Sequence, residues 1–225
     1  MIENSLLAAL PGAAYRRLLA GFEPVDLSFG EILYEPGQTI SHVYFPGSSL
    51  VSLLTLADGH LALEVGLIGR DGMTGVPLVL GFKESAVRAL VQGAGTASRM
   101  EAGVFMREFR RSPRLQRELY RYIHTLMAQI SQTAACNRFH VVEQRLARWL
   151  LMTHDRVKAD RFRMTHEFLG HMLGVRRVGV TKAAQALQQR KLISYSRGDI
   201  TVLDRAGLEA ATCPCYGIVK DMHDT

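Results

Sequence analysis

The chain has 225 residues, of which 48% are hydrophobic and 21% are charged, a composition that excludes wholesale disorder and allows a real core. No apolar run approaches the roughly 20 residues that span a bilayer, and the N-terminus lacks the basic start of a secretory signal. Three cysteines are too few for a disulfide framework, so we expect a soluble protein of the reducing cytoplasm.

Charge is distributed unevenly along the chain. Residues 1–100 carry six Lys/Arg against nine Asp/Glu, a net charge of −3, and residues 101–225 carry 21 against 12, a net charge of +9. A basic half joined to a mildly acidic half indicates a polyanion-binding module attached to a part with another task. A solvated basic face is the open alternative.

Residues 25–100 have the pattern of β structure, preceded by a short helical lead over residues 5–19. Apolar and polar residues alternate over 25–29 and again over 61–65, and Gly- and Pro-containing turn pairs interrupt the chain at short intervals. Many short strands with frequent turns predict a sandwich or a jelly-roll-like barrel. The lack of alternating strands and helices excludes a parallel doubly wound sheet.

A long amphipathic helix is predicted from about Pro113 to Phe139, where there is no glycine and the only proline suits a first helical turn. An apolar stripe at spacings of three and four follows one side of it: Leu115, Leu119, Tyr122, Leu126, Ile130 and Thr133. A helix this long cannot easily bury its stripe in one small domain, so we expect a homodimer built on residues 114–138. The alternative is that the stripe packs on the chain's own β domain.

A second amphipathic helix is expected over 140–154, and a loop or short strand over 155–163. The next segment fits a helix-turn-helix residue by residue. Thr165 can cap the first helix, Gly174 stands where a tight turn needs a positive φ, and Val175 fills the angle between the helices. The inward face of the second helix consists of Val180, Ala183, Ala184 and Leu187.

The outward face of that second helix is basic or amide-bearing and comprises Arg176, Arg177, Lys182 and Gln185. Such a face places hydrogen-bond donors at base edges and phosphates of a major groove. Two short strands, 192–196 and 200–203, follow as a β wing would, with Arg197 in their turn suited to a phosphate contact. A plain helical hairpin with a solvated face is the alternative.

The stretch from Thr165 to Leu203 resembles the winged helix-turn-helix of the Crp/Fnr family of transcription regulators. The resemblance extends to residues 30–37, which look like the family's first β-roll turn, and to the long helix, which corresponds to its dimerisation helix. It implies an α+β fold with three parts: a cyclic-nucleotide-binding-like β-roll sensor over 1–113, a dimerisation helix over 114–139 and a winged helix-turn-helix over 140–225.

By this likeness the groove-facing positions are Arg176, Arg177, Val178, Gly179 and Lys182, with Thr165 and His166 near the DNA backbone. Family members often have an acidic residue where this chain has Val178. A valine can touch a thymine methyl group but cannot accept a hydrogen bond from cytosine, so the family's commonest half-site is not assumed. The implied partners are double-stranded DNA, a second copy of the chain and, as a candidate, RNA polymerase.

Cyclic-nucleotide-binding members carry a Gly-Glu pair for the ribose and a downstream Arg-Ser/Thr for the cyclic phosphate. Met73 stands at the glutamate position and has no carboxylate for the ribose. Glu84 stands at the arginine position and would repel the phosphate. We therefore expect an effector other than cyclic AMP, although Arg88 or Lys83 could substitute if the alignment shifts by a few residues. The candidate effector pocket comprises Arg70, Met73, Glu84 and Arg88.

Metal and cofactor chemistry is not expected. The oxygen-sensing branch of the family holds an iron–sulfur cluster on N-terminal cysteines, and this chain has no cysteine before Cys136. Cys213 and Cys215 offer two thiolates without a clear third and fourth ligand, so a C-terminal turn is favoured over a zinc site. Cys136 is expected to be a small packing residue.

Residues 58–64 loosely resemble the metal motif of the jelly-roll cupin enzymes, but Ala62 stands where the second histidine is needed. No nucleophile–base arrangement and no phosphate-cradling glycine loop is found. The leading interpretation is therefore a sequence-specific DNA-binding regulator and not an enzyme. The alternatives are a metal-dependent cupin-like enzyme and a ligand-binding module that acts on protein partners.

Overall fold

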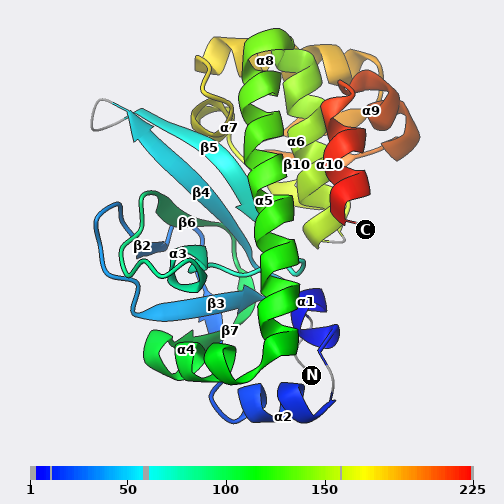
Figure 1. The fold of residues 1–225 in the computed structure, drawn as a ribbon. Coiled ribbons are helices and arrows are strands. Elements are labelled where there is room, and N and C mark those ends of the chain that lie inside the picture. The colour runs from blue at the N-terminus through cyan, green and yellow to red at the C-terminus, as the bar shows by residue number, and fades with distance from the viewer. Residues whose placement is uncertain (1–3, 11, 58–60, 158, 224–225) are drawn as a thin grey trace. The chain divides into compact units, whose positions relative to one another are not determined.

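The computed structural model describes residues 4–10, 12–57, 61–157 and 159–223. It divides the chain into two compact units, residues 1–55 with 66–127 and residues 56–65 with 128–225. Figure 1 shows the ribbon, coloured from the N-terminus to the C-terminus. Helices and antiparallel strands are segregated along the chain, so the predicted α+β class is confirmed.

The first unit is built around two antiparallel sheets, with strand orders β1-β7-β3 and β2-β6-β4-β5. Its core is apolar and includes Val43, Phe45, Leu50, Val91 and Met100, each at most 1% exposed. The β structure predicted for 25–100 is therefore confirmed. The strands are β1 (Glu23–Leu27), β2 (Ile32–Tyr34), β3 (His42–Pro46), β4 (Leu50–Ala57), β5 (Leu61–Ile68), β6 (Arg88–Gly93) and β7 (Gly95–Glu101). The end of β4 from residue 56 and the start of β5 up to residue 65 are grouped with the second unit.

Short helices flank these sheets. The lead predicted over 5–19 forms two helices, α1 (Ser5–Ala8) and α2 (Gly12–Leu19), and α3 (Val76–Val79) lies between β5 and β6. Helix α4 (Ala102–Arg111) follows β7, and its Phe105 packs against Phe45 with ring centroids 6.2 Å apart.

The long helix α5 (Pro113–Phe139) has the predicted bounds, but its apolar stripe is used differently from the prediction. Leu115, Leu119, Tyr122 and Leu126 are between 0% and 7% exposed within a single chain. The Tyr122 hydroxyl donates a 2.9 Å hydrogen bond to the Met73 carbonyl, and a Cβ on Gly72 would meet the Tyr122 ring. These side chains complete the core of their own β unit, which is the alternative that the sequence left open, and they offer little surface to a second chain.

The opposite side of α5 is the exposed one. Tyr120 and Met127 are 53% and 62% exposed, and polar or small residues continue their line toward the end of the helix. We call this set the outer stripe; it comprises Tyr120, His124, Met127, Ser131, Ala134 and Arg138. Its steps of four and three residues follow the heptad pattern of helices that pair.

The second unit is mostly helical and contains one small sheet of order β8-β10-β9. Leu146, Leu150, Leu169, Val180 and Leu187 form its core and are at most 1% exposed. Its remaining elements are α6 (Val142–Val157), β8 (Arg161–Arg163), α7 (His166–Leu173), α8 (Arg177–Gln189), β9 (Ile193–Ser196), β10 (Asp199–Val202), α9 (Arg205–Ala211) and α10 (Cys215–His223).

Helix α6 begins two residues later and ends three residues later than predicted, and the expected short strand is β8. Asp155, predicted to lie in a loop, is in the last turn of α6. Its carboxylate contacts Arg205 at 2.7 Å and accepts a 2.9 Å hydrogen bond from the Tyr216 hydroxyl. Both partners are distant in sequence. They keep the polar last turn of α6 helical, although its local sequence does not favour a helix. Among the described residues no helix is both long and apolar enough to cross a membrane.

Candidate DNA-binding site

The turn between α7 and α8 has the predicted backbone geometry. The Thr165 hydroxyl accepts a 3.1 Å hydrogen bond from the Phe168 N–H and thereby caps α7. Gly174 ends the helix with φ 60°, which a glycine adopts without strain. The Val175 N–H then donates to the Gly170 carbonyl at 2.9 Å. A Cβ on Gly170 would lie 2.9 Å from the Val175 carbonyl oxygen, so the close turn also depends on this second glycine.

Helix α8 separates a buried face from an exposed basic face. Val180, Ala183, Ala184 and Leu187 are at most 5% exposed, which confirms the predicted inward face. Arg176 is the N-cap residue and Arg177 the first helical residue, so both side chains start from the N-terminal end of α8. The exposed positions are Arg176, Arg177, Val178, Lys182 and Gln185. Hydrogen-bond donors therefore gather where a recognition helix contacts base edges.

His166 connects three elements beside this face. Its Nδ1 lies 3.0 Å from the Thr181 Oγ1, and its ring stacks on Tyr195 with centroids 4.0 Å apart and an interplanar angle of 16°. The Thr181 hydroxyl donates its own hydrogen to the Arg177 carbonyl at 3.1 Å, so the His166 Nδ1–H is the donor to Thr181. The remaining ring nitrogen, Nε2, is then an acceptor.

Two effects keep this imidazole neutral. Burial, and then the positive charge of Arg177, lower the pKa of His166 below its usual value of 6.5. His166 Nε2 is buried without a hydrogen-bond partner among the described residues. A neutral ring thus links the start of α7, the recognition helix α8 and strand β9. The sequence placed His166 near DNA but did not indicate this positioning role.

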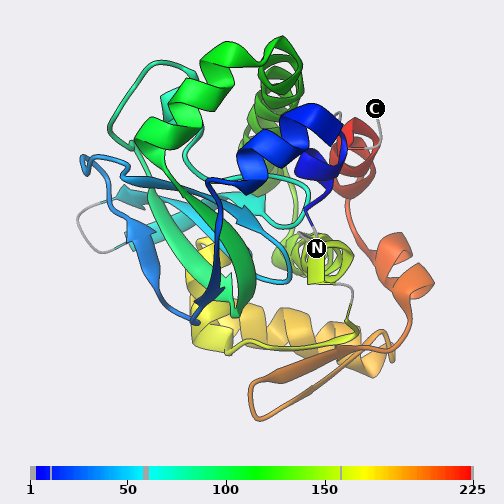
Figure 2. The ribbon, with the colours of Figure 1, turned by 90° about the horizontal axis from the view of Figure 1, so that it is seen from below.

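The wing is a tight antiparallel hairpin of β9 and β10, visible at the foot of Figure 2. Its two turn residues, Arg197 and Gly198, have φ of 51° and 87°, as a type I′ turn requires. Arg197 is exposed at the tip, where the sequence predicted a phosphate contact. The Met164 N–H donates to the Gly198 carbonyl at 2.6 Å, which ties the tip to the start of the helix-turn-helix.

The four residues assigned to an effector pocket lie in different environments. The Met73 side chain is 0% exposed and belongs to the core, whereas Glu84 is exposed. Arg70 is half-buried. Arg88, the alternative phosphate-binding arginine, already contacts the Glu35 carboxylate at 2.8 Å through both Nε and Nη2. A cyclic phosphate would have to compete with that carboxylate.

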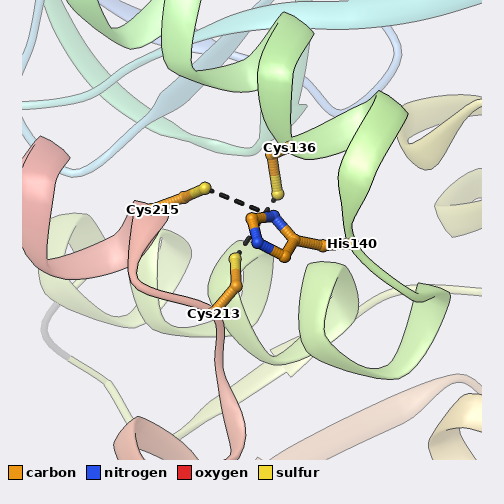
Figure 3. A group of neighbouring side chains, drawn as sticks. All are labelled: Cys136, His140, Cys213 and Cys215. Carbon is orange, nitrogen blue, oxygen red and sulfur yellow. Dashed lines mark hydrogen bonds between the residues drawn. The ribbon is translucent and has the colours of Figure 1, made fainter.

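A cluster of three cysteines and one histidine lies in the same unit as the helix-turn-helix (Figure 3). Cys136, Cys213 and Cys215 are at most 2% exposed, and His140 is half-buried. Their potential ligand atoms all lie within 4.8 Å of one another. The sequence indicates no third and fourth ligand for the Cys213–Cys215 pair, and the fold brings Cys136 and His140 beside it. The spacing of four between Cys136 and His140 was the available signal.

Comparisons with known proteins agree with this architecture. Residues 144–211 match the family model of the Crp-like helix-turn-helix domain. No curated protein matches the chain. Among solved structures, FixK2 from Bradyrhizobium japonicum has a TM-score of 0.73 at 13% identity, covering 85% of this chain and 98% of that one. This chain therefore has the fold of FixK2 over nearly the whole FixK2 chain.

Two further structures show the same likeness. The c-di-GMP-responsive global regulator CLP from Xanthomonas campestris has a TM-score of 0.69 at 17% identity, with 85% of this chain and 99% of that one covered. A transcriptional regulator of the Crp/Fnr family from Thermus thermophilus has a TM-score of 0.66 at 19% identity, with 90% and 99% covered.

Residues 144–211 therefore form a Crp-like helix-turn-helix domain. Over most of its length the chain has the fold of solved regulators of the Crp/Fnr family.

Proposed function

We propose that this protein is a homodimeric regulator that reads a specific DNA sequence with α8 and anchors itself through the wing. The observation that carries the proposal is the division of α8 into a buried apolar face and an exposed basic face, with its arginines at the N-terminal end. Partnership with chromosomal DNA implies action in the cytoplasm. RNA polymerase is a candidate partner. The proposed domains are a sensor over residues 1–113, a dimerisation helix over 114–139 and a DNA-binding domain over 140–225.

Individual roles follow from position on the helix. Arg176 and Arg177 are assigned to base edges, and the 60% exposed Val178 to a thymine methyl group. Gly179 allows close approach of the helix backbone, while Lys182 and Gln185 contact the next base or phosphate. Thr165 and His166 support the DNA backbone contact, and Arg197 binds a phosphate from the wing.

The second chain is proposed to pack on the outer stripe of α5. The stripe predicted from sequence is largely occupied by the chain's own core, whereas Tyr120 and Met127 expose most of their apolar surface. Ile130 is half-buried and Thr133 is 7% exposed, so neither offers a full contact surface. Two copies of the outer stripe, at heptad spacing, form a self-complementary interface around a two-fold axis.

We propose no catalytic role for the β unit, and an effector other than cyclic AMP. In the cupin-like segment, His60 lies outside the described residues. Glu64 is 7% exposed and accepts a 2.9 Å hydrogen bond from the Trp149 indole. A carboxylate held in this way by a buried indole belongs to the core, which disfavours the metal-enzyme alternative.

Selection of bound DNA from a random library tests the proposal, followed by affinity measurements at two salt concentrations. Arg177→Ala should weaken the free energy of DNA binding by roughly 1–3 kcal/mol per half-site and relax the base preference at one position of the site. Arg197→Ala should weaken binding to all sequences alike and lower the slope of log affinity against log salt concentration by about one. The selected site should be an inverted repeat with half-site centres roughly 34 Å apart.

Arg190→Ala is the matched control, because it removes the same charge from the opposite end of α8. It should leave sequence preference unchanged. If the Arg177→Ala and Arg197→Ala variants lost the same affinity for every DNA sequence, α8 would not be the element that reads bases. Failure to enrich any sequence from the library would overturn the proposed function.

A further inference from the structure

The Cys136, His140, Cys213 and Cys215 side chains converge on one point from two distant segments, the end of α5 and the start of α10 (Figure 3). We propose that these four residues bind one zinc ion in a closed tetrahedral site. Nothing in the DNA-binding role requires such a site, so the proposal stands apart from the proposed function.

The distances fit a single ion. The sulfurs of Cys136 and Cys213 are 3.5 Å apart, and the Cys215 sulfur is 3.4 Å from the His140 Nδ1. A tetrahedral ion with bonds of about 2.3 Å to sulfur and about 2.0 Å to nitrogen separates its ligand atoms by about 3.5–3.8 Å. A cubane iron–sulfur cluster would insert inorganic sulfides and several irons between its cysteines and hold them farther apart.

The donor set also selects the metal. Three thiolates with one imidazole are soft ligands that suit zinc, and four protein ligands leave no open position for a substrate. The Gln132 side-chain N–H donates a 3.0 Å hydrogen bond to the Cys215 sulfur, an outer contact that would orient this ligand toward an ion. Cys215 is the first residue of α10, where the positive end of the helix dipole favours negative charge.

A positive charge lies beside the cluster. The Arg148 guanidinium of α6 is close enough to Cys136 to stabilise negative charge there. Zinc with three thiolates and one imidazole carries a net charge of −1, which this guanidinium would partly balance.

The chain prepares the site without the ion. The His140 N–H donates a 3.1 Å hydrogen bond to the Cys136 carbonyl, so the two side chains follow one another on the same side of a helical turn. Cys213 and Pro214 connect α9 to α10, and Cys215 is the first residue of α10. An ion here would join residues 75 and 77 positions apart, and its binding free energy would add to the stability of the folded unit.

A Cys136–Cys213 disulfide is the competing explanation for the two close sulfurs. A disulfide would not explain why the Cys215 sulfur also lies 3.4 Å from the His140 Nδ1 in the same cluster. The zinc site accounts for all four side chains.

The test uses the full chain purified under reducing conditions. Elemental analysis should give about one zinc per chain after gel filtration. Replacement by Co²⁺ should give the visible bands of a tetrahedral ion and the intense near-ultraviolet band of cobalt–thiolate bonds. Cys136→Ser and Cys213→Ser should each lose these bands, and His140→Gln should weaken metal binding. His171→Gln, which alters an exposed histidine of the same unit, is the matched control and should keep them.

A second measurement on the unmodified chain covers the case in which the cysteine variants fail to fold. A zinc chelator should lower the unfolding temperature and expose three thiols to a thiol reagent, and added zinc should reverse both effects. Zinc content below roughly a tenth of an ion per chain after incubation with the metal would overturn the proposal. So would cobalt bands that persist in the Cys136→Ser/Cys213→Ser double variant, or a Cys136–Cys213 disulfide found in the reduced preparation.

Discussion

The indole N–H of Trp149 donates a 2.9 Å hydrogen bond to the Oε1 of Glu64, and both side chains are buried. The two residues are 85 positions apart and belong to the same compact unit. Residues 56–65, which sequence patterning assigns to the β domain, are therefore part of the unit that carries the helix-turn-helix. A buried carboxylate needs such donors, because its desolvation is otherwise unfavourable.

Removal of the indole donor should destabilise the unit that contains residues 56–65. Trp149→Phe leaves the Glu64 carboxylate with one donor fewer, and we expect a loss of about 1–3 kcal/mol in the free energy of unfolding. Glu64→Gln keeps an oxygen acceptor for the indole and should lose less. Urea unfolding followed by circular dichroism measures both variants. If Glu64→Gln were the more damaging change, the hydrogen bond would not be the stabilising feature.

Substitutions on the two sides of α5 should separate dimerisation from stability. Met127→Glu/Ala134→Glu places like charges on the outer stripe of both copies and should give folded monomers in sedimentation experiments. Leu119→Ala empties a 0% exposed position and should lower the free energy of unfolding by about 2–5 kcal/mol while the chain stays dimeric. Monomers from Leu119→Ala together with an intact dimer of the charged variant would restore the interface first predicted from sequence.

His166 should make stability depend on pH. Its pKa is lowered on folding, so the unfolded state binds more protons at acid pH. The contribution of neutral His166 is present above pH 6.5 and is lost as the pH falls below that value. His166→Asn retains a donor for Thr181 and does not titrate. The stability difference between the native chain and this variant should therefore shrink from about pH 7.5 to about pH 5.5 in urea unfolding, and parallel pH profiles would contradict the assignment.

Cyclic AMP should not bind. Met73 supplies no carboxylate to a ribose, its side chain is buried, and Arg88 is paired with Glu35. Calorimetry at millimolar nucleotide should show only heats of dilution. Sub-millimolar binding that disappears in Arg88→Ala would show that the arginine exchanges its carboxylate partner for a phosphate.

Local physical rules made much of the architecture predictable. The bounds of α5 follow from a run without glycine after an initial proline, and Thr165 and Gly174 mark the ends of α7 because capping and positive φ are properties of single residues. The buried face of α8 follows from helical periodicity, which needs only the order of apolar residues. The wing turn was likewise recognisable from Gly198 between two short strands.

The tertiary structure alone decided which surfaces meet. Periodicity identifies an apolar stripe on α5 but not its partner, and the β unit of the same chain covers it, which leaves Tyr120 and Met127 exposed. The cysteine cluster depends on the path of α9 and α10 back to the end of α5, across 77 residues that no local pattern relates. Local sequence determines the shape of each element, whereas burial and ligand geometry depend on contacts that exist only once the chain has folded.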